Sequence, residues 1–415
     1  MRQIKQKNND IRMNQENQSS YPTITLAKGK DKRIRHGHLW IFSNELLPMQ
    51  NRPEPGEIVN VYSAENKYVG TGFYHPNSLI AVRLLTRKPA VIDRAFFEHR
   101  LKQAAASREN LRSETNAIRL VYAESDGLPG LIVDQYRDGI VLQVLSAGME
   151  KQRNTVIEIL TEILKPVFIV IRNDHLMRER EGLTQQKELF TGDATDIPVT
   201  ITENSVSYQI DPLEGHKTGF YIDQRDNRLL FRRFINKGDR VLDAFCHFGG
   251  FSIHAALAGA GEVLAVDDSD TVLEATRRNI HINNMEDIIS TRKADLMKLL
   301  PRMAEEKKTF HAINLDPPNF ATNRKSVGPA LRGYRKIHRA ALEMLEPGGI
   351  LATSSCSHHI TEDAFLESVQ RACRDSGRRV QLLYRGGHPH DHPILPEMPE
   401  TGYLKFFIFR VIEIS

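Results

Sequence analysis

Short apolar strands alternate with amphipathic helices from about residue 216 onward, and this alternation limits the possible folds more than any other feature of the chain. The predicted strands span 240–245, 262–267, 312–316 and 350–355. Repeated strand–helix units pack into a mostly parallel sheet with helices on both faces. The sequence therefore predicts an α/β fold here. Two final strands, 380–385 and 403–414, are expected to form an antiparallel hairpin at the sheet edge.

The length of the chain, 415 residues, allows two or three domains, because domains average about 150 residues. No apolar run approaches the roughly 20 residues of a membrane helix. The first 20 residues have no apolar centre like that of a secretory signal, which favours a cytoplasmic protein. The three cysteines, Cys246, Cys356 and Cys373, lie far apart. Neither a disulfide framework nor a cysteine-based zinc site is therefore expected, and no metal is predicted.

The front of the chain is basic: residues 1–90 contain 14 Lys and Arg against 7 Asp and Glu, whereas the whole chain has a net charge of +4. Residues 1–20 are polar and predict a disordered extension. Residues 21–92 contain short strands separated by Pro and Gly, which predict a small β-barrel. Its basic residues near Trp40 suggest a polyanion as partner, and a merely solvated basic face is the alternative. These residues are Lys28, Lys30, Lys32, Arg33 and Arg35.

Residues 93–214 mix helical and strand patterns and predict a small central α+β domain. A helix is expected over 94–112, and a second one ends at Lys165-Pro166. We find no catalytic pattern in this stretch. The α/β domain is then expected to span residues 215–415.

Acidic residues follow successive strands of the predicted sheet. Asp243 ends the first strand and precedes a glycine turn at Gly249, where the backbone can approach a ligand closely. The turn lacks GxGxxG, which disfavours a dinucleotide. Asp267 ends the second strand and is placed to accept ribose hydroxyls. Asp295 falls where a further strand, between the strands 262–267 and 312–316, is expected to end, and it would lie there next to an adenine ring. The sequence predicts a nucleoside site, with simple helix capping by these acids as the alternative.

The next two strands end in residues suited to chemistry. Asp316 precedes two prolines that stiffen the loop at the carboxyl edge of the sheet. Cys356 follows the fifth strand and is expected at the same edge, whereas Cys246 and Cys373 are expected to be small buried hydrophobes. A thiol has a pKa of about 8.5, so it needs a cationic or polar setting to attack at neutral pH. For the loop that follows Asp316, a stiff loop without chemistry is the alternative.

A polar segment, residues 215–228, precedes the sheet. Arg225 can bind a carboxylate and Asp223 an ammonium group, so the segment suits a zwitterion. An ordinary capped helix start is the alternative. The three histidines within residues 388–393 alternate with prolines that make a metal cage awkward, and they favour a polar loop near the active edge.

Several motifs together resemble one family. HKTGFYIDQRDNR, DAFCHFGGFS, VDDSD, DPPNF, RGYRKI, SCSHH, DHPIL and YLKFFIF occur in the order found in bacterial PUA-domain cytosine-5 methyltransferases of large-subunit (23S) ribosomal RNA. The resemblance runs from about residue 22 to the end. It implies a PUA barrel, a small central α+β domain and a class I domain that uses S-adenosylmethionine, with a homodimer as a plausible assembly.

The resemblance also implies site residues. Cys356 would be the nucleophile, and Asp316 would touch both the target base and the cofactor. Pro-Asn-Phe stands where related enzymes often have a second cysteine, which implies a one-cysteine mechanism and leaves the group that releases the product open. The implied cofactor residues are Lys217, Thr218, Phe220, Asp223, Arg225, Asp243, Phe248, Gly249, Asp267, Asp295 and Asp316.

The implied chemistry suits a thiol, because carbon 5 of cytosine is a poor nucleophile until a thiolate adds to carbon 6. A base must then remove the proton on carbon 5. Two other functions stay open. Asp-Pro-Pro before an aromatic residue also suits direct methylation of an exocyclic amine, which needs no thiol. A non-catalytic RNA-binding assembly factor is the other.

Overall fold

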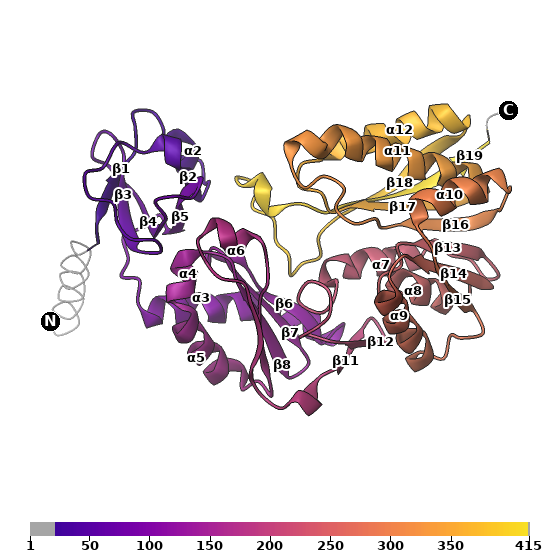
Figure 1. The fold of residues 1–415 in the computed structure, drawn as a ribbon, viewed down its shortest axis with the longest axis horizontal. Helices are drawn as coiled ribbons and strands as arrows, with labels where there is room; N and C mark the ends of the chain where they lie inside the picture. The colour runs from indigo at the N-terminus through magenta and orange to yellow at the C-terminus, as the bar shows by residue number, and fades with distance from the viewer. Residues whose placement is uncertain (1–20, 414–415) are drawn as a thin grey trace. The chain divides into compact units, whose positions relative to one another are not determined.

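The computed structural model describes residues 21–413, so the predicted disordered extension at residues 1–20 lies outside the described residues. Contacts divide the chain into two compact units. Among the described residues, unit 1 contains residues 21–199, 211–219 and 390–401, and unit 2 contains residues 200–210, 220–389 and 402–413. The predicted barrel and most of the predicted central domain fall in unit 1, whereas residues 200–210 of that predicted domain fall in unit 2 with the large sheet (Figure 1). The predicted domain boundaries stay a prediction.

The N-terminal part of unit 1 is a five-stranded sheet in the order β1-β3-β4-β5-β2. An isolated bridge between Leu26 and Leu46 joins the two ends of the sheet, so it closes on itself as the strand pattern predicts. Ile24, Val59 and Val82 are fully buried within it. Its strands are β1 (Thr23–Thr25), β2 (Trp40–Phe42), β3 (Ile58–Tyr62), β4 (Tyr68–Tyr74) and β5 (Ile80–Thr86), and its short helix is α2 (Lys32–Arg35).

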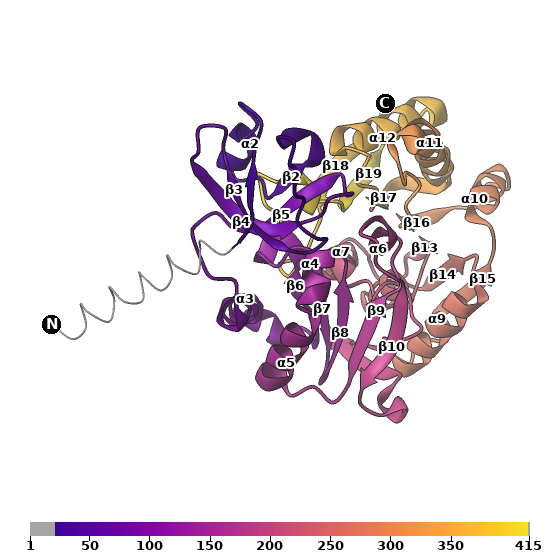
Figure 2. The same ribbon diagram turned by 60° about the vertical axis from the view of Figure 1, so that its left-hand side comes forward.

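The central part of unit 1 is a second five-stranded sheet, in the order β10-β9-β8-β7-β6. Helices α3 (Arg94–Ser107) and α5 (Arg153–Leu164) pack against it through one apolar core (Figure 2). Shorter helices are α4 (Ala147–Lys151) and α6 (Met177–Arg180). The strands are β6 (Ala117–Tyr122), β7 (Leu131–Tyr136), β8 (Gly139–Val144), β9 (Ile169–Asn173) and β10 (Gln186–Thr191).

The predicted helix over residues 94–112 is shorter in the structure. It begins at Asp93, whose side chain accepts a hydrogen bond from the Phe96 amide, and ends at Ser107. Arg108 then turns inward and pairs with both oxygens of Asp126, at 2.6 and 2.8 Å. This buried pair redirects the chain, which continues as a 3-10 turn over Glu109–Ser113.

Unit 2 contains a seven-stranded sheet in the order β15-β14-β13-β16-β17-β19-β18. The first five are parallel, and β19 runs antiparallel to both of its neighbours. This confirms the predicted parallel sheet with an antiparallel hairpin at its edge. The strands are β13 (Arg240–Ala244), β14 (Glu262–Asp267), β15 (Ile289–Lys293), β16 (Phe310–Leu315), β17 (Leu345–Ser355), β18 (Arg379–Gly386) and β19 (Lys405–Ile412).

Helices cover both faces of this sheet (Figure 1). One face carries α10, α11 and α12, which share an apolar core with the central strands. The other face carries α7, α8 and α9, and the hairpin formed by β11 (Val199–Glu203) and β12 (Val206–Ile210) contacts α9. The helices are α7 (Arg225–Arg232), α8 (Gly250–Leu257), α9 (Asp270–Ile282), α10 (Leu296–Glu305), α11 (Val327–Met344) and α12 (Glu362–Ser376). Within residues 21–413, no helix combines the length and apolarity needed to cross a bilayer.

Candidate active site

The turn after β13 has an unusual backbone. Phe245, His247 and Gly249 all have positive φ, at 64°, 50° and 77°, and each such non-glycine residue costs roughly 1–3 kcal/mol unless its surroundings hold it in place. Asp243 supplies part of that support, because its carboxylate accepts hydrogen bonds from the backbone and hydroxyl of Ser252 and from the Asn314 amide. Asp243 is fully buried. Its observed role is to hold the turn, and its contact with a cofactor stays a prediction.

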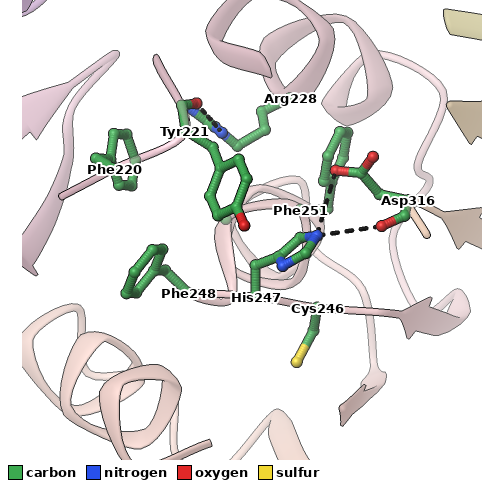
Figure 3. Close-up of a pocket in the computed structure, with 9 residues that line it drawn as sticks. Phe220, Tyr221, Arg228, Cys246, His247, Phe248, Phe251 and Asp316 are labelled. Atoms are coloured by element: carbon green, nitrogen blue, oxygen red, sulfur yellow. Dashed lines mark hydrogen bonds and ion pairs between the residues drawn. The ribbon is translucent and has the colours of Figure 1, made fainter. Parts of the chain in front are cut away.

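A small pocket opens beside this turn, and all of its lining residues belong to unit 2 (Figure 3). Tyr221 lies against the His247 ring with 4.6 Å between ring centroids. The Nε2 atom of His247 lies 3.1 Å from the Asp316 carbonyl oxygen. Burial, followed by the charge of Asp316, raises the pKa of Tyr221. The lining residues are Phe220, Tyr221, Arg228, Cys246, His247, Phe248, Gly250, Phe251 and Asp316.

Arg228 fixes the wall of this pocket. Its guanidinium pairs with both oxygens of the buried Glu203 on β11, at 2.8 and 2.7 Å. The remaining nitrogen donates to the Tyr221 carbonyl at 3.0 Å, and the guanidinium lies 4.9 Å from the Phe220 ring centroid. Burial is the largest single influence on the pKa of Arg228 and lowers it. The charge and hydrogen bonds of Glu203 act in the opposite direction, and the pKa is raised overall. Arg228 therefore holds the Phe220–Tyr221 backbone in place.

The two remaining strand-end acids differ in exposure. Asp267 is largely buried at the end of β14, where its carboxylate accepts hydrogen bonds from the backbone amides of His247, Asp268 and Ser269. It therefore lies beside the glycine turn. Asp295 is exposed and caps α10 by accepting from the Met297 amide. This is the capping role that the sequence left as an alternative, and contact of either acid with a nucleoside stays a prediction.

The polar segment before the sheet is divided between the two units. Lys217 and Thr218 belong to unit 1, where the Thr218 hydroxyl donates to the Asp134 carboxylate. Asp223 and Arg225 belong to unit 2 and are both buried. Asp223 accepts a 2.6 Å hydrogen bond from the Tyr403 hydroxyl. The assignment of all four residues to the cofactor stays a prediction.

Asp316 and Cys356 follow neighbouring parallel strands, β16 and β17, and so lie at the same edge of the sheet. The Gln224 amide joins these strands at that edge, because its Nε2 donates to Asp316 Oδ1 at 2.9 Å and to Ser354 Oγ at 3.1 Å. The Asn227 side-chain amide donates to Oε1 of Gln224 at 2.7 Å and so fixes the orientation of the Gln224 amide.

Cys356 is partly exposed between two fully buried serines. Ser355 accepts from the Tyr334 hydroxyl at 3.0 Å, and Ser357 donates to the side chain of Asn319 at 2.6 Å. Burial raises the pKa of Tyr334 to about 12, so this phenol stays protonated as a donor. The loop is thus anchored on both sides of the thiol.

The other two thiols have different surroundings. Cys246 is 4% exposed, and burial raises the pKa of its thiol well above the ordinary value. Figure 3 shows its sulfur on the far side of the turn from Asp316. Burial also raises the pKa of Cys373, which lies on α12.

The basic residues of the barrel divide into two groups. Lys28, Lys30 and Lys32 are exposed, whereas Arg33 turns inward, donates to the Trp40 carbonyl and to Glu45, and covers the Phe42 ring. Arg35 is exposed and pairs with Asp31. Trp40 donates from its indole to Glu124, at 2.9 Å.

The histidine-rich segment is divided between the two units. His388 belongs to unit 2, where its Nε2 accepts hydrogen bonds from the backbone amides of Tyr403 and Leu404, and a place for the whole segment near the active edge stays a prediction. Residues 390–401 belong to unit 1, where the Asp391 carboxylate accepts from the Arg119 amide and its carbonyl accepts from Arg108. His392 is buried beside Tyr122, with 5.1 Å between ring centroids. Among the residues that the structure describes, no group of three His, Cys, Asp or Glu side chains is arranged to hold a metal ion.

Family models and solved structures agree with this architecture. A model described as a PUA-like domain matches residues 24–87, and one described as an S-adenosylmethionine-dependent methyltransferase matches residues 138–410. A Streptococcus mutans protein described as a SAM-dependent methyltransferase superposes with a TM-score of 0.80 at 19% identity, covering 94% of this chain and all of its own. A second structure, of a methyltransferase complexed with SAH, gives a TM-score of 0.81 with the same identity and coverage. The fold is therefore that of a class I methyltransferase with a PUA-like barrel.

Curated relatives extend the match over nearly the whole chain. Ribosomal RNA large subunit methyltransferase I of Shewanella frigidimarina is 41% identical, and the alignment covers 94% of this chain and 99% of that protein. The proteins of the same name from Shewanella denitrificans and Tolumonas auensis are each 40% identical over 94% of this chain. The chain belongs to the PUA-domain S-adenosylmethionine-dependent methyltransferases, so its cofactor is S-adenosylmethionine.

The pocket residues suit this cofactor. The aromatic rings of Phe220, Tyr221 and Phe248 offer an apolar lining, and Asp267 places a largely buried carboxylate beside the same turn. A carboxylate at the end of the second strand is the usual acceptor for ribose hydroxyls. Asp316, the predicted target-base residue, also lines this pocket.

Proposed function

We propose that this protein methylates carbon 5 of a cytosine in large-subunit ribosomal RNA, with Cys356 as a transient covalent nucleophile. The observation that carries the proposal is the position of Cys356 and Asp316 after adjacent parallel strands, β17 and β16, with Asp316 lining the pocket. The relatives named as large-subunit ribosomal RNA methyltransferases support the substrate class.

Cys356 adds through its sulfur to carbon 6 of the base, which makes carbon 5 an enamine carbon able to attack an electrophile. S-adenosylmethionine supplies the methyl group when it is bound. Asp316 binds the N3 and N4 edge of the cytosine and stabilises the N3-protonated ring that forms during addition. Gln224 holds the Asp316 carboxylate in place for this contact, through its 2.9 Å hydrogen bond.

The target base must leave its stack before Cys356 can reach carbon 6, which costs a few kcal/mol in paired RNA. The barrel supplies phosphate contacts that offset part of this cost, through the exposed Lys28, Lys30 and Lys32. Single-stranded or bulged cytosines are the targets that require the least unstacking free energy for such an enzyme.

The test is nucleoside analysis by mass spectrometry of ribosomal RNA treated with the protein and S-adenosylmethionine. We expect 5-methylcytidine, and we expect Cys356→Ala to abolish it while Cys373→Ala retains it. N4-methylcytidine, N6-methyladenosine or a methylated guanosine amine as the product would instead support direct transfer to an exocyclic amine. Cofactor binding without a methylated nucleoside in any RNA would support an assembly factor.

A further inference from the structure

Lys405 lies beside the thiol loop although 49 positions separate it from Cys356 in the sequence. It is the first residue of β19, which pairs antiparallel with β17, and the register places it directly opposite Ser355. Residues directly opposite in an antiparallel pair have Cβ atoms about 4.5–5.5 Å apart. The lysine therefore faces the strand end from which the Cys356 loop departs.

The amine of Lys405 is held by two backbone carbonyls. Its Nζ donates to the carbonyl of Ser357 at 2.6 Å and to that of Tyr403 at 2.7 Å. A neutral amine has two N–H bonds and one lone pair, so these two acceptors use both of its donors and leave the lone pair for a proton. Because Ser357 is the residue after Cys356, the amine is tied to the loop that carries the thiol.

The charged and titratable groups around Lys405 favour a proton exchange with this thiol. Burial lowers the pKa of Lys405 to about 8, and the negative charges of Cys356 and Glu362 oppose that effect. A lysine whose pKa is lowered in this way is partly neutral near neutral pH, so its amine can accept a proton from a neighbouring thiol. His358, in the same loop, is the other candidate acceptor. Burial and then the charge of Lys405 lower its pKa, and its ring packs on Tyr403.

We propose that Lys405 takes the proton of Cys356 when the thiol becomes a nucleophile. This inference rests on the proposed function. The S–H bond breaks and its electron pair stays on sulfur, while the lone pair of Nζ forms a new N–H bond. The resulting ammonium stabilises the thiolate until sulfur bonds to carbon 6. After a base removes the proton on carbon 5, the bond between carbon 6 and sulfur breaks and its electron pair returns to sulfur. The thiolate then takes the proton back from Nζ, so the pair is restored.

The first test measures the reactivity of Cys356 without RNA. The full-length protein is treated with iodoacetamide across pH 6 to 10, and alkylation of the Cys356 peptide is followed by mass spectrometry. In Lys405→Met we expect the midpoint of the pH profile to rise by about one unit or more, and the rate at pH 7 to fall about tenfold. Lys336→Met is the matched control, because it removes an exposed lysine of α11 and should leave the profile unchanged. An unchanged midpoint in Lys405→Met would overturn the proposal.

The second test separates chemistry from packing. We expect RNA methylation by Lys405→Met to fall about 100-fold at pH 7 and to recover at least tenfold at pH 9.5, where the thiol ionises unaided. The affinity for S-adenosylhomocysteine, measured by calorimetry, should stay within twofold. A loss that is equal at all pH values would show a structural role and contradict the inference. Should Lys405→Met not fold, Lys405→Gln keeps N–H donors for both carbonyls and carries the same expectations.

Failure of the role inferred for Lys405 can be distinguished from failure of the proposed function. If Cys356→Ala methylates RNA at the full rate, the nucleophile is wrong and so is the catalytic step assigned to Lys405, whatever the alkylation profile shows. If Cys356 is required and its alkylation midpoint does not move in Lys405→Met, only the role of Lys405 is overturned. A midpoint that moves in His358→Ala and stays in Lys405→Met would assign the proton to His358 instead.

Discussion

Gln224 donates from its side-chain amide to the Asp316 carboxylate at 2.9 Å, and the same nitrogen reaches Ser354 on the neighbouring strand at 3.1 Å. One amide thus fixes the position of the carboxylate relative to the strand that leads to Cys356. Orientation of this kind can be worth several kcal/mol in a barrier, because a small misplacement of a reacting group slows the reaction strongly.

Replacement of Gln224 should therefore reduce the rate constant more than the affinity. In Gln224→Glu the donor is lost and a second carboxylate faces Asp316, so we expect kcat to fall about 100-fold, which corresponds to about 2.7 kcal/mol. Gln224→Met removes the donor without adding a charge and should cost about tenfold. Steady-state methylation with saturating cofactor measures both. Equal kcat values in wild type and Gln224→Glu would contradict the positioning role.

The buried pair of Glu203 and Arg228 should matter for stability. Its two partners are 0% and 4% exposed at their side chains, and breaking a buried ion pair by removing one partner costs about 3–5 kcal/mol. We expect Glu203→Leu to lower the melting temperature clearly and to weaken cofactor binding, since Arg228 holds the Tyr221 carbonyl. Calorimetric melting with and without S-adenosylhomocysteine measures both effects. A decrease in the unfolding free energy of less than about 1 kcal/mol would show that the Glu203–Arg228 pair does not stabilise the fold as a buried ion pair.

Acid should destabilise unit 2 through His338. This side chain is fully buried in contact with Thr353 and Ser368, and burial lowers its pKa to about 3. Between pH 6.5 and pH 3 the unfolded chain binds a proton that the folded chain refuses, so the folded state loses up to about 1.4 kcal/mol per pH unit as the pH falls. His338→Gln should flatten this dependence in urea unfolding curves. If the unfolding free energy of His338→Gln falls with pH as steeply as that of the wild type, the assignment to His338 is refuted.

Binding of RNA should depend on the lysines of the barrel and less on its arginines. Neutralising Lys28, Lys30 and Lys32 should make the log–log salt dependence shallower by about 0.7 per lost phosphate contact on single strands. Arg33 is used internally, so Arg33→Ala should lower the stability of the barrel, with a smaller effect on the salt slope. Filter binding across a salt series gives both slopes. An unchanged slope in the triple lysine variant would remove these residues from the RNA-binding surface.

The strand ends of the large sheet could be predicted because each is marked locally. The predicted strand 262–267 matches β14 in full, and parallel strands bring their carboxyl ends to one edge, so Asp267, Asp316 and Cys356 could be placed together without coordinates. The glycine turn could also be predicted, because its glycine follows shortly after the end of a locally marked strand. What the pattern did not distinguish is whether an acid faces a ligand or its own backbone, as with Asp243 and Asp295.

Residues brought in by long-range pairing could not be predicted. Lys405 reaches the thiol loop only through the register of β19 on β17. Glu203 pairs with Arg228 from a stretch that the sequence assigned to the central domain. Tyr221, Gln224 and Arg228 lay within a segment recognised as polar, and Tyr334 lay within RGYRKI. Their motifs were visible, but the direction of each side chain depends on packing that no local pattern encodes.

The most direct test of the central claim uses RNA that carries 5-fluorocytidine at the target position. A fluorine on carbon 5 cannot leave as a proton, so an adduct between carbon 6 and the enzyme persists after methyl transfer. With S-adenosylmethionine present, we expect wild type and Cys373→Ala to form a band that survives denaturing electrophoresis and contains both protein and RNA, and we expect Cys356→Ala to form none. A covalent band of equal intensity with Cys356→Ala, or none with a wild-type protein that methylates ordinary cytidine, would contradict the account.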